Sequence, residues 1–466
     1  MTRILYLIFF LLGSSLCVLA KPNVIYILAD DLGYGDLSVY GQEHFETPHI
    51  DQLAHEGMRF TQHYAGSTVC APSRCSLLTG KDIGHAAVRG NAEVNPEGQK
   101  PMPANTFTMA HLFKSSGYTT GVFGKWGLGA PGSSSEPLKV GFDRFYGYNC
   151  QRQAHHYYPY FLWNDNQREI LWKNFGLENG TYAPDLIQKE VLDFIEDNKD
   201  HPFFCYYALI QPHAEMFAPE AYMEKFRGKY LPESSFEGTD SGPRFRKGAY
   251  GTQKEGHAAF AAMVSVMDDY VGEVVEKLKE LGLEDDTLII FSSDNGPHTE
   301  AGHDPSYFNS NGRFRGFKRD LYEGGIRIPM IACWPGQIAA ESVSDHLSAF
   351  WDVLPTMADL LGVETPEDID GISFLPTLYQ QGKQEEHAFM YWEFHELGGR
   401  LAVRKGNWKG VLYNVSDPDS KMELYDLDTD PGESNDLATF HPEIVSQLEA
   451  IVRSARTTSP VEEFNF

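Results

Sequence analysis

The segment from Val69 to Gly80 combines residue types that could carry out nucleophilic chemistry on an anionic substrate. Pro72, two residues after Cys70, suits the first turn of a helix because its φ is fixed. Cys70 would therefore lie beside the free N–H groups of a helix start, where an anion binds favourably. The alternative is a buried structural cysteine that precedes an ordinary helix.

The same segment resembles the signature of the type I sulfatases, Cys-x-Pro-Ser-Arg followed by Leu-x-Thr-Gly. The matching residues are Cys70, Pro72, Ser73, Arg74, Leu77, Thr79 and Gly80. The family usually ends the motif with Arg, whereas Lys81 stands here, which keeps the charge but loses the planar fork. In that family a separate formylglycine-generating or sulfatase-maturating enzyme converts the cysteine to Cα-formylglycine (3-oxoalanine). The resemblance implies the same modification of Cys70.

Polar residues follow two apolar segments that we expect to be buried parallel strands. Asp30 and Asp31 follow residues 24–29, and Asp294 and Asn295 follow residues 287–292. Adjacent strand ends can bring these oxygens together as a hard-ligand set suited to Ca²⁺ or Mg²⁺. Ordinary turn carboxylates are the alternative. The resemblance implies that these four residues and the modified residue 70 coordinate one Ca²⁺ ion.

Two further segments extend the resemblance. Residues 124–129 are similar to the family's Gly-Lys-Trp-His-Leu-Gly, which makes Lys125 a sulfate-binding and catalytic residue. The family's His, which contacts the modified residue, is Gly127 here. Residues 316–329 resemble the block with a second sulfate-binding lysine, which is Lys318 in this chain.

His213, after the expected strand 203–210, resembles a catalytic and substrate-binding histidine of the family, although a solvent-facing loop histidine is the alternative. The mechanism implied begins with attack of a formylglycine hydroxyl on sulfur. The metal, Arg74, Lys125 and Lys318 stabilise the charge on the sulfuryl oxygens. His213, together with Lys318, protonates the leaving oxygen. The second hydroxyl then expels sulfate from the covalent sulfo-enzyme intermediate.

The weakly periodic segment 130–180 is rich in Gly, Tyr, Trp and Asn, and we interpret it as an insertion that shapes the substrate pocket. His155 and His156 precede three tyrosines, a composition that suits stacking on sugar rings, although a packed aromatic loop is the alternative. His298 is a third candidate for substrate binding. We expect a sulfated polysaccharide or glycosaminoglycan fragment as the substrate.

These residues need a scaffold that brings distant strand ends together. Apolar segments alternate with helical periodicity, which indicates an α/β fold with a large, mixed, mostly parallel sheet flanked by helices. The resemblance implies the alkaline phosphatase-like arrangement. Expected strands are 24–29, 119–123, 203–210, 287–292 and 328–333, and expected helices are 48–58, 106–116, 184–196, 257–281 and 345–361.

The pattern changes after about residue 380. Short segments at 389–394, 401–403, 408–413 and 423–425 predict antiparallel strands, and 441–454 predicts a final helix. We therefore expect a catalytic domain over 21–380 and a small C-terminal α+β subdomain over 381–466.

Composition restricts the partners. The 466 residues carry a formal net charge of −27 and show no basic stripe, which argues against nucleic acid as a partner. Any sulfate site must therefore be locally basic.

The N-terminus has the pattern of a secretory signal peptide. An apolar run from Ile4 to Leu12 precedes small residues before Lys21, which predicts cleavage near Ala20 and a periplasmic or secreted protein. A membrane anchor is the alternative, but the run is short for a span, so we expect no stable anchor. Five cysteines remain after Cys17 is removed, and four if Cys70 is modified, which permits at most two disulfides in an oxidising compartment.

Two alternatives to an arylsulfatase-like sulfuric ester hydrolase stay open. One is a phosphodiester or phosphonate ester hydrolase of the same superfamily, although Lys125 and Lys318 favour sulfate. The other is an inactive secreted sulfoglycan-binding relative that lacks the modification of Cys70.

Overall fold

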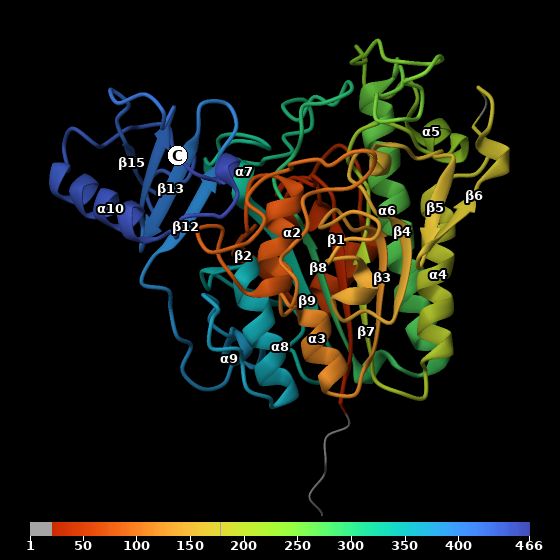
Figure 1. The fold of residues 1–466 in the computed structure, drawn as a ribbon, viewed down its shortest axis with the longest axis horizontal. Coiled ribbons are helices and arrows are strands. Elements are labelled where there is room, and N and C mark those ends of the chain that lie inside the picture. The colour runs from red at the N-terminus through yellow and green to blue at the C-terminus, as the bar shows by residue number, and fades with distance from the viewer. Residues whose placement is uncertain (1–20, 178) are drawn as a thin grey trace, which may run out of the picture.

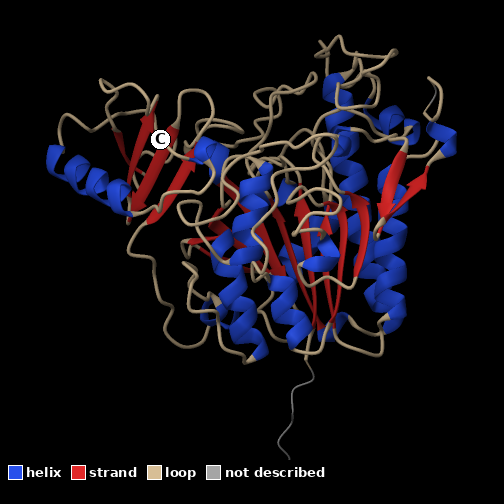
Figure 2. Ribbon diagram, in the orientation of Figure 1, coloured by secondary structure: helices blue, strands red, loops and turns tan. Residues whose placement is uncertain are grey.

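The computed structural model describes residues 21–177 and 179–466, so the predicted signal peptide at 1–20 lies outside the described residues. A mixed eleven-stranded sheet forms its centre (Figures 1 and 2), in the order β10-β2-β9-β8-β1-β7-β3-β4-β5-β6, with β11 beside β2. Strands β8, β1, β7, β3 and β4 are parallel neighbours, while β9 and β5 run antiparallel to β8 and β4. The predicted class, a mixed and mostly parallel sheet flanked by helices, is confirmed.

The strands of the large sheet are β1 (Asn23–Ala29), β2 (Met58–Tyr64), β3 (Thr119–Lys125), β4 (Arg144–Tyr148), β5 (Phe161–Asn164), β6 (Gln167–Ile170), β7 (Phe203–Ala208), β8 (Thr287–Ser293), β9 (Arg327–Cys333), β10 (Ser342–Ser344) and β11 (Ser348–Ala349). The helices are α1 (Pro48–Glu56), α2 (Cys70–Thr79), α3 (Met109–Ser115), α4 (Ala183–Asp197), α5 (Glu220–Phe226), α6 (Gly256–Leu281), α7 (Glu323–Ile326), α8 (Val353–Leu361), α9 (Leu375–Tyr379) and α10 (Pro442–Ser454).

Helices cover both faces of the sheet, as Figure 2 shows. Alternate residues of β1 face opposite sides because side chains alternate along a strand. Val24, Tyr26 and Leu28 join the core formed with α2, α3 and α8. Ile25 and Ile27 join the core formed with α1, α4 and α6. Burial on both faces explains the unbroken apolar run that predicted this strand.

Several elements differ from the sequence-based prediction. The helix expected over 345–361 is replaced at its start by β11 and a 3-10 turn over Phe350–Asp352, and only α8 is α-helical. The Asp352 carboxylate accepts a hydrogen bond from the backbone N–H of Ala349 at 2.8 Å, which stabilises that turn. Strand β2 and the β5–β6 hairpin were missed because their residues mix polar and apolar side chains without a clear period of two.

The C-terminal segment forms a separate four-stranded antiparallel sheet with β12 (Met390–Phe394), β13 (Arg400–Lys405), β14 (Trp408–Tyr413) and β15 (Glu423–Asp426). Leu448 of α10 packs on Val403, Met422 and Leu424 of this sheet. In Figure 1 this unit lies at the upper left, beside the carboxyl ends of the parallel strands, and β5 and β6 lie at the upper right. The division of the chain at residue 380 stays a prediction.

Two further observations concern the described residues alone. None of the helices within 21–177 and 179–466 is long and apolar enough to cross a membrane. All five cysteines in these ranges are buried free thiols, so neither of the two disulfides that the sequence permits is formed among the described residues.

Candidate active site

The ends of β1 and β8 bring the predicted carboxylates together. These strands are parallel neighbours with Ala29 opposite Ser293, so the residues that follow emerge at one edge of the sheet. The Asp31 backbone N–H donates to Asp294 Oδ1 at 3.0 Å, and Asn295 Nδ2 donates to Asp31 Oδ1 at 2.7 Å. Asp30, Asp31, Asp294 and Asn295 are all fully buried. We call these four residues with Cys70 the Cys70 cluster.

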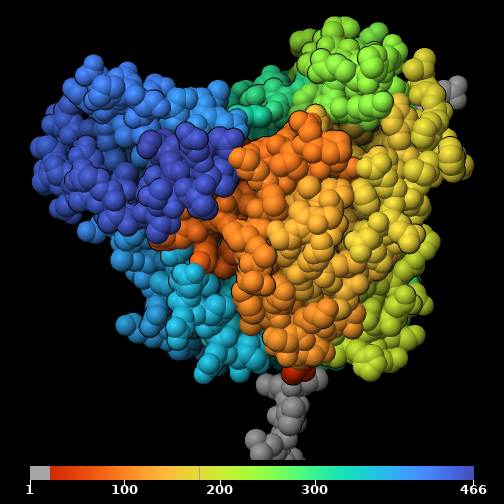
Figure 3. All heavy atoms as spheres, viewed as in Figure 1, coloured from red at the N-terminus to blue at the C-terminus, as the bar shows by residue number. Residues whose placement is uncertain are grey.

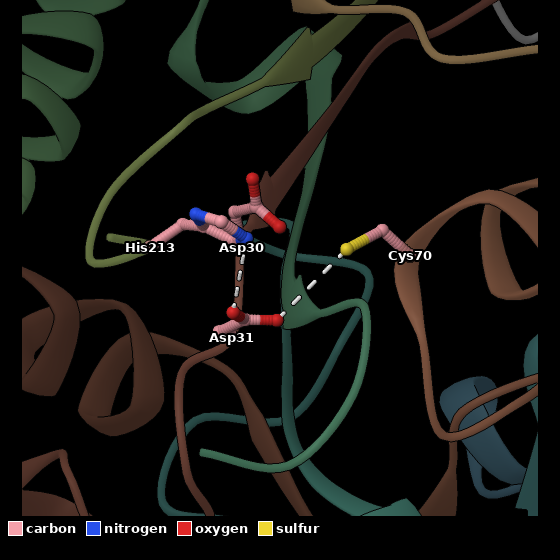
Figure 4. Close-up of side chains that lie close together, drawn as sticks. All are labelled: Asp30, Asp31, Cys70 and His213. Carbon is pink, nitrogen blue, oxygen red and sulfur yellow. Dashed lines mark hydrogen bonds and ion pairs between the residues drawn. The ribbon is translucent and has the colours of Figure 1, made fainter. Parts of the chain in front are cut away.

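Cys70 is the first residue of α2, as the sequence predicted. Its Sγ lies 3.9 Å from Asp31 Oδ1, and Figure 4 shows the Cys70 and His213 contacts converging on Asp31. Burial raises the pKa of the Cys70 thiol well above its usual range, although Lys125 and Lys318 oppose the shift. The unmodified side chain is therefore a neutral thiol and a poor nucleophile.

Two cations pair with these carboxylates: Arg74 of α2, and Lys125, the last residue of β3. Both Nε and Nη2 of Arg74 donate to Asp294 Oδ2, at 3.0 and 2.8 Å, and its Nη1 donates to the Lys125 carbonyl oxygen. Lys125 Nζ lies 2.6 Å from Asp30 Oδ2. Burial disfavours a charged Asp30, but Lys125, His213 and Arg74 hold the pKa of Asp30 well below its usual range. Burial and the Asp30 charge raise the pKa of Asp294 to about 7.

Lys318 and His213 close the opposite side. Lys318 Nζ lies 2.7 Å from Asp31 Oδ2 and donates to His213 Nε2 at 3.1 Å. The His213 Nδ1 hydrogen-bonds the Ala214 carbonyl oxygen, which requires a proton on Nδ1 and leaves Nε2 as an acceptor. Burial and Lys318 lower the pKa of His213 to about 4. The shared proton therefore resides on Lys318.

The donor set fits a hard divalent cation. The Oδ1 atoms of Asp30 and Asn295 are buried and accept no hydrogen bond from any described residue. Ligand atoms of Asp30, Asp31, Cys70 and His213 lie within 4.8 Å of one another. Carboxylate and amide oxygens are the preferred ligands of Ca²⁺ and Mg²⁺, and the sulfur of Cys70 is the one soft donor among the predicted ligands. Conversion of that residue to an oxygen donor would complete the set.

The three histidines expected to bind substrate occupy different places. The His155 ring stacks on His213 with centroids 5.1 Å apart, and the His298 ring lies 5.7 Å from His213. These three rings form one wall of the cluster. His156 is turned away, since its Nε2 accepts from the Gly248 N–H and its Nδ1 lies 3.3 Å from Glu215 Oε2. Of the neighbouring tyrosines, Tyr157 and Tyr158 are packed inside the protein.

The two departures from the sulfatase signature have local explanations. A Cβ atom at Gly127 would lie 2.9 Å from Cγ of Gln151, and the residue has a φ of +72° that disfavours a side chain. Gln151 thus occupies the space that a larger residue would need. Lys81 pairs with Asp368 in an exposed contact, so this departure lies at the periphery of the molecule.

Sequence reasoning missed three residues next to Lys318. Glu300 Oε2 lies 3.5 Å from Lys318 Nζ, and Arg319 Nη2 donates to Glu300 Oε1 at 2.6 Å. The Tyr250 hydroxyl donates to Glu300 at 3.3 Å, and its ring lies 5.0 Å from that of His155. Glu300 follows Asn295 by only five positions, but no spacing rule pointed to it.

The C-terminal subdomain holds the loop that carries Lys318. Arg400 of β13 places Nη1 2.7 Å from Asp320 Oδ1, and the Tyr413 hydroxyl of β14 donates to the same oxygen at 3.1 Å. The Arg319 N–H also donates to the Thr68 carbonyl oxygen, two residues before Cys70. Contacts from both parts of the molecule therefore fix the position of Lys318.

The chain is similar to known proteins along most of its length. The sulfatase family model matches residues 22–363, and the model for the C-terminal part of N-sulphoglucosamine sulphohydrolase matches residues 312–457. The chain is 32% identical to N-acetylgalactosamine-6-sulfatase of Mus musculus over 452 residues, which cover 90% of this chain and 77% of that protein. It is 31% identical to arylsulfatase A of Homo sapiens, with 94% and 89% coverage.

A solved structure shares the whole architecture. Ps i-CgsB, solved in complex with k-i-k-neocarrahexaose, superposes with a TM-score of 0.77 at 26% identity, over 93% of this chain and 92% of that one. The similarity thus includes both the large sheet and the C-terminal sheet.

Proposed function

Because the chain belongs to the sulfatase family and is a sulfatase, we propose that it removes sulfate from a sulfated carbohydrate, either a polysaccharide or a glycosaminoglycan fragment. The observation that carries this proposal is the group of three buried cations, Arg74, Lys125 and Lys318, around an oxygen-rich cluster beside Cys70. The names of the relatives, which include an N-acetylgalactosamine-6-sulfatase, support a sugar substrate.

Arg74, Lys125 and Lys318 would bind the sulfuryl oxygens and stabilise the charge that develops on them. They lie in a region that excludes water, where such interactions are strong and need little reorganisation during the reaction. A divalent cation held by Asp30, Asp31, Asp294 and Asn295, which we propose to be Ca²⁺, would polarise the sulfate ester as a Lewis acid.

Lys318 and His213 would supply the proton for the leaving alcohol. In the resting arrangement Lys318 donates to a neutral His213, so Lys318 holds the proton and His213 orients it. The predicted joint role of His213 and Lys318 is thereby divided: Lys318 carries the proton and His213 positions it. The stacked ring of His155 limits the orientations open to His213.

We further propose that Cys70 is converted to Cα-formylglycine by a maturating enzyme, and that its hydrate provides the attacking hydroxyl. The high pKa of the buried thiol supports this step, because a neutral thiol would attack sulfur slowly. The N-terminal pattern supports export to the periplasm or beyond the cell, with removal of the first 20 residues.

Sulfate release from a panel of sulfated saccharides tests the proposal directly. Ion chromatography should detect free sulfate from at least one sugar and from a small aryl sulfate used as an artificial substrate. Phosphate diesters and phosphonate monoesters should be tested in parallel. Faster turnover of those esters than of every sulfate ester would overturn the proposal.

A further inference from the structure

A groove lies beside the site, between the 150–170 segment and the 246–247 turn. It encloses about 540 Å³ and is lined by residues that include the cations Arg152, Arg168, Arg246 and Lys247. Glu97 contributes the single carboxylate among its lining residues. This composition is unusual in a chain whose net charge is −27. We call it the basic groove.

Aromatic rings continue the basic groove to the surface. Tyr160 and Phe161 line it, and the Tyr160 ring packs on Phe175 with centroids 4.9 Å apart. Phe175 in turn lies 5.4 Å from Trp172. Trp172 is 74% exposed and Phe175 is 54% exposed, so the fold gains little from burying them. Exposed aromatic strips of this kind mark surfaces that bind a partner or a ligand.

The basic groove and the Cys70 cluster share one wall. Gln153 lines the groove, and His155, in the same 3-10 turn (Gln153–His155), stacks on His213. On the other side of the wall, Lys247 lines the groove and Tyr250 packs on His155 at 5.0 Å. In Figure 3 the yellow surface of β5 and β6 adjoins the green 216–255 segment at the upper right. A ligand that crosses His155 would reach both regions.

The cations of the groove are arranged for anions. The Arg168 guanidinium lies 4.4 Å from the Phe161 ring centroid and donates to Glu97 at 2.7 Å, while its side chain remains 49% exposed. Stacking and pairing hold its planar fork, which suits the oxygens of a sulfate group. Arg152 is 37% exposed, and Lys247 is also exposed. Neighbouring rings and cations match a chain of sugars that carries sulfate groups.

We propose that the basic groove binds a second sulfated unit of the same saccharide chain whose ester lies at the Cys70 cluster. This inference rests on the proposed function and narrows its substrate to oligosaccharides or polysaccharides with repeated sulfate groups. Chain length and a distant sulfate then determine affinity, while the Cys70 cluster determines the chemistry. A monosaccharide sulfate would reach the cluster without touching the groove.

The test compares small and large substrates in the same preparations. The variants are Arg168→Ala combined with Lys247→Ala, and Trp172→Ala alone. The double variant removes two cations and Trp172→Ala removes an exposed ring. Each should raise KM for a sulfated hexasaccharide about tenfold and leave turnover of an aryl sulfate unchanged. Matched controls are Lys189→Ala, an exposed cation on α4, and Phe440→Ala, which is 75% exposed in the C-terminal subdomain.

Equal losses on both substrates, or no loss on either, would overturn the inference. Binding measured by calorimetry on the Cys70→Ala protein separates it from the proposed function. A panel of sulfated hexasaccharides should bind that protein at least tenfold more tightly than their desulfated counterparts, and the groove variants should abolish the difference. Light scattering tests whether the exposed rings of Trp172 and Phe175 instead form a contact between copies of the chain. A lower particle mass for Trp172→Ala than for the wild-type protein would assign them to that contact and contradict the proposal.

Discussion

Two buried groups of charges differ in how completely they are partnered. In the Cys70 cluster, the Oδ1 atoms of Asp30 and Asn295 accept no hydrogen bond from the described residues. The second group joins α7 to the C-terminal sheet. There Lys409 Nζ lies 2.9 Å from both Glu323 Oε1 and Glu433 Oε1, and Arg327 Nη1 lies 3.1 Å from Glu323 Oε2. We call these four residues the junction cluster.

This difference suggests a ligand-binding role for the Cys70 cluster and a structural role for the junction cluster. In the junction cluster each charge has an oppositely charged partner within 3.1 Å, and Lys409 Nζ joins Glu323 to Glu433 across two parts of the chain. In the Cys70 cluster, Asn295 Oδ1 accepts no hydrogen bond from the described residues, and Asp30 Oδ1 lies 3.5 Å from Arg74 Nη2, longer than an ordinary hydrogen bond. Buried polar groups are normally satisfied, so two weakly partnered oxygens within one group of carboxylates beside Cys70 indicate a ligand site.

The largest effect is expected at Cys70. The Cys70→Ala variant should lose sulfate ester hydrolysis by a factor of about 10³ or more, because its nucleophile is removed while the fold is kept. Cys75→Ala, in the same helix but outside the cluster, is the matched control and should stay active. Initial rates and circular dichroism on both variants check this expectation. Retained activity in Cys70→Ala would contradict the mechanism.

A substitution in the junction cluster should lower stability and leave activity nearly unchanged. Lys409→Met leaves the charges of Glu323 and Glu433 without their shared partner, and breaking a buried pair costs about 3–5 kcal/mol of unfolding free energy. Activity per folded molecule should change less than about twofold. Urea unfolding measures the loss, with the exposed Lys405→Met as control. Equal unfolding free energies for both variants would show that the junction cluster does not stabilise the fold.

Metal addition should stabilise only the first region. Calcium at about 100 times its Kd should add about 2.7 kcal/mol of unfolding free energy to the wild-type protein relative to buffer with a chelator. Asp30→Ala removes one of the proposed ligands and should abolish most of this gain. Thermal unfolding with Ca²⁺, Mg²⁺ and EGTA checks the response. An undiminished calcium effect in the variant would move the metal elsewhere.

A smaller effect is expected at the contact between the C-terminal sheet and the loop that carries Lys318. Arg400→Ala removes one of the two contacts that hold Asp320 Oδ1 and so loosens the loop that positions Lys318. KM for a sulfate ester should rise ~5-fold, or about 1 kcal/mol, because Tyr413 still holds Asp320. The change in kcat should be smaller. Steady-state kinetics with the exposed Arg453→Ala as control test the link. An unchanged KM would mean that the contacts of Tyr413 and Thr68 fix the loop without Arg400.

The smallest effect concerns pH. Burial raises the pKa of Glu433 from its ordinary value of 4.5 to about 7, and Glu323 adds to the shift while Lys409 opposes it. Between pH 4.5 and pH 7 the folded protein therefore keeps a proton on Glu433 that the unfolded chain has released. Stability from this group is therefore present at low pH and lost as the pH rises towards 7. Glu433→Gln should show a weaker decline between pH 5 and pH 7. Parallel stability curves for both proteins would contradict the shift.

The sequence predicted the strands that are buried on both faces, because β1, β7 and β8 read as unbroken apolar runs followed by polar residues. It predicted the Cys70 cluster because Asp30, Asp31, Asp294 and Asn295 come directly after two of them. The hairpin β5–β6 was missed, since half of its surface faces solvent and its register depends on tertiary contacts.

The direction in which a side chain points could not be predicted from the sequence either. His155 and His156 are adjacent, but only His155 stacks on His213, while His156 bonds to the 248 backbone. The roles of Glu300 and Arg400 depend on contacts between distant segments that no local pattern encodes. These residues became visible only through the fold.

The most direct test of the account is the mass of the tryptic peptide over residues 60–74, which contains Cys70. It should be measured on protein from an active preparation. The account predicts a peptide that has lost sulfur and two hydrogens and gained one oxygen, as expected for formylglycine at position 70. An active preparation in which every copy of this peptide carries an unmodified thiol would contradict it.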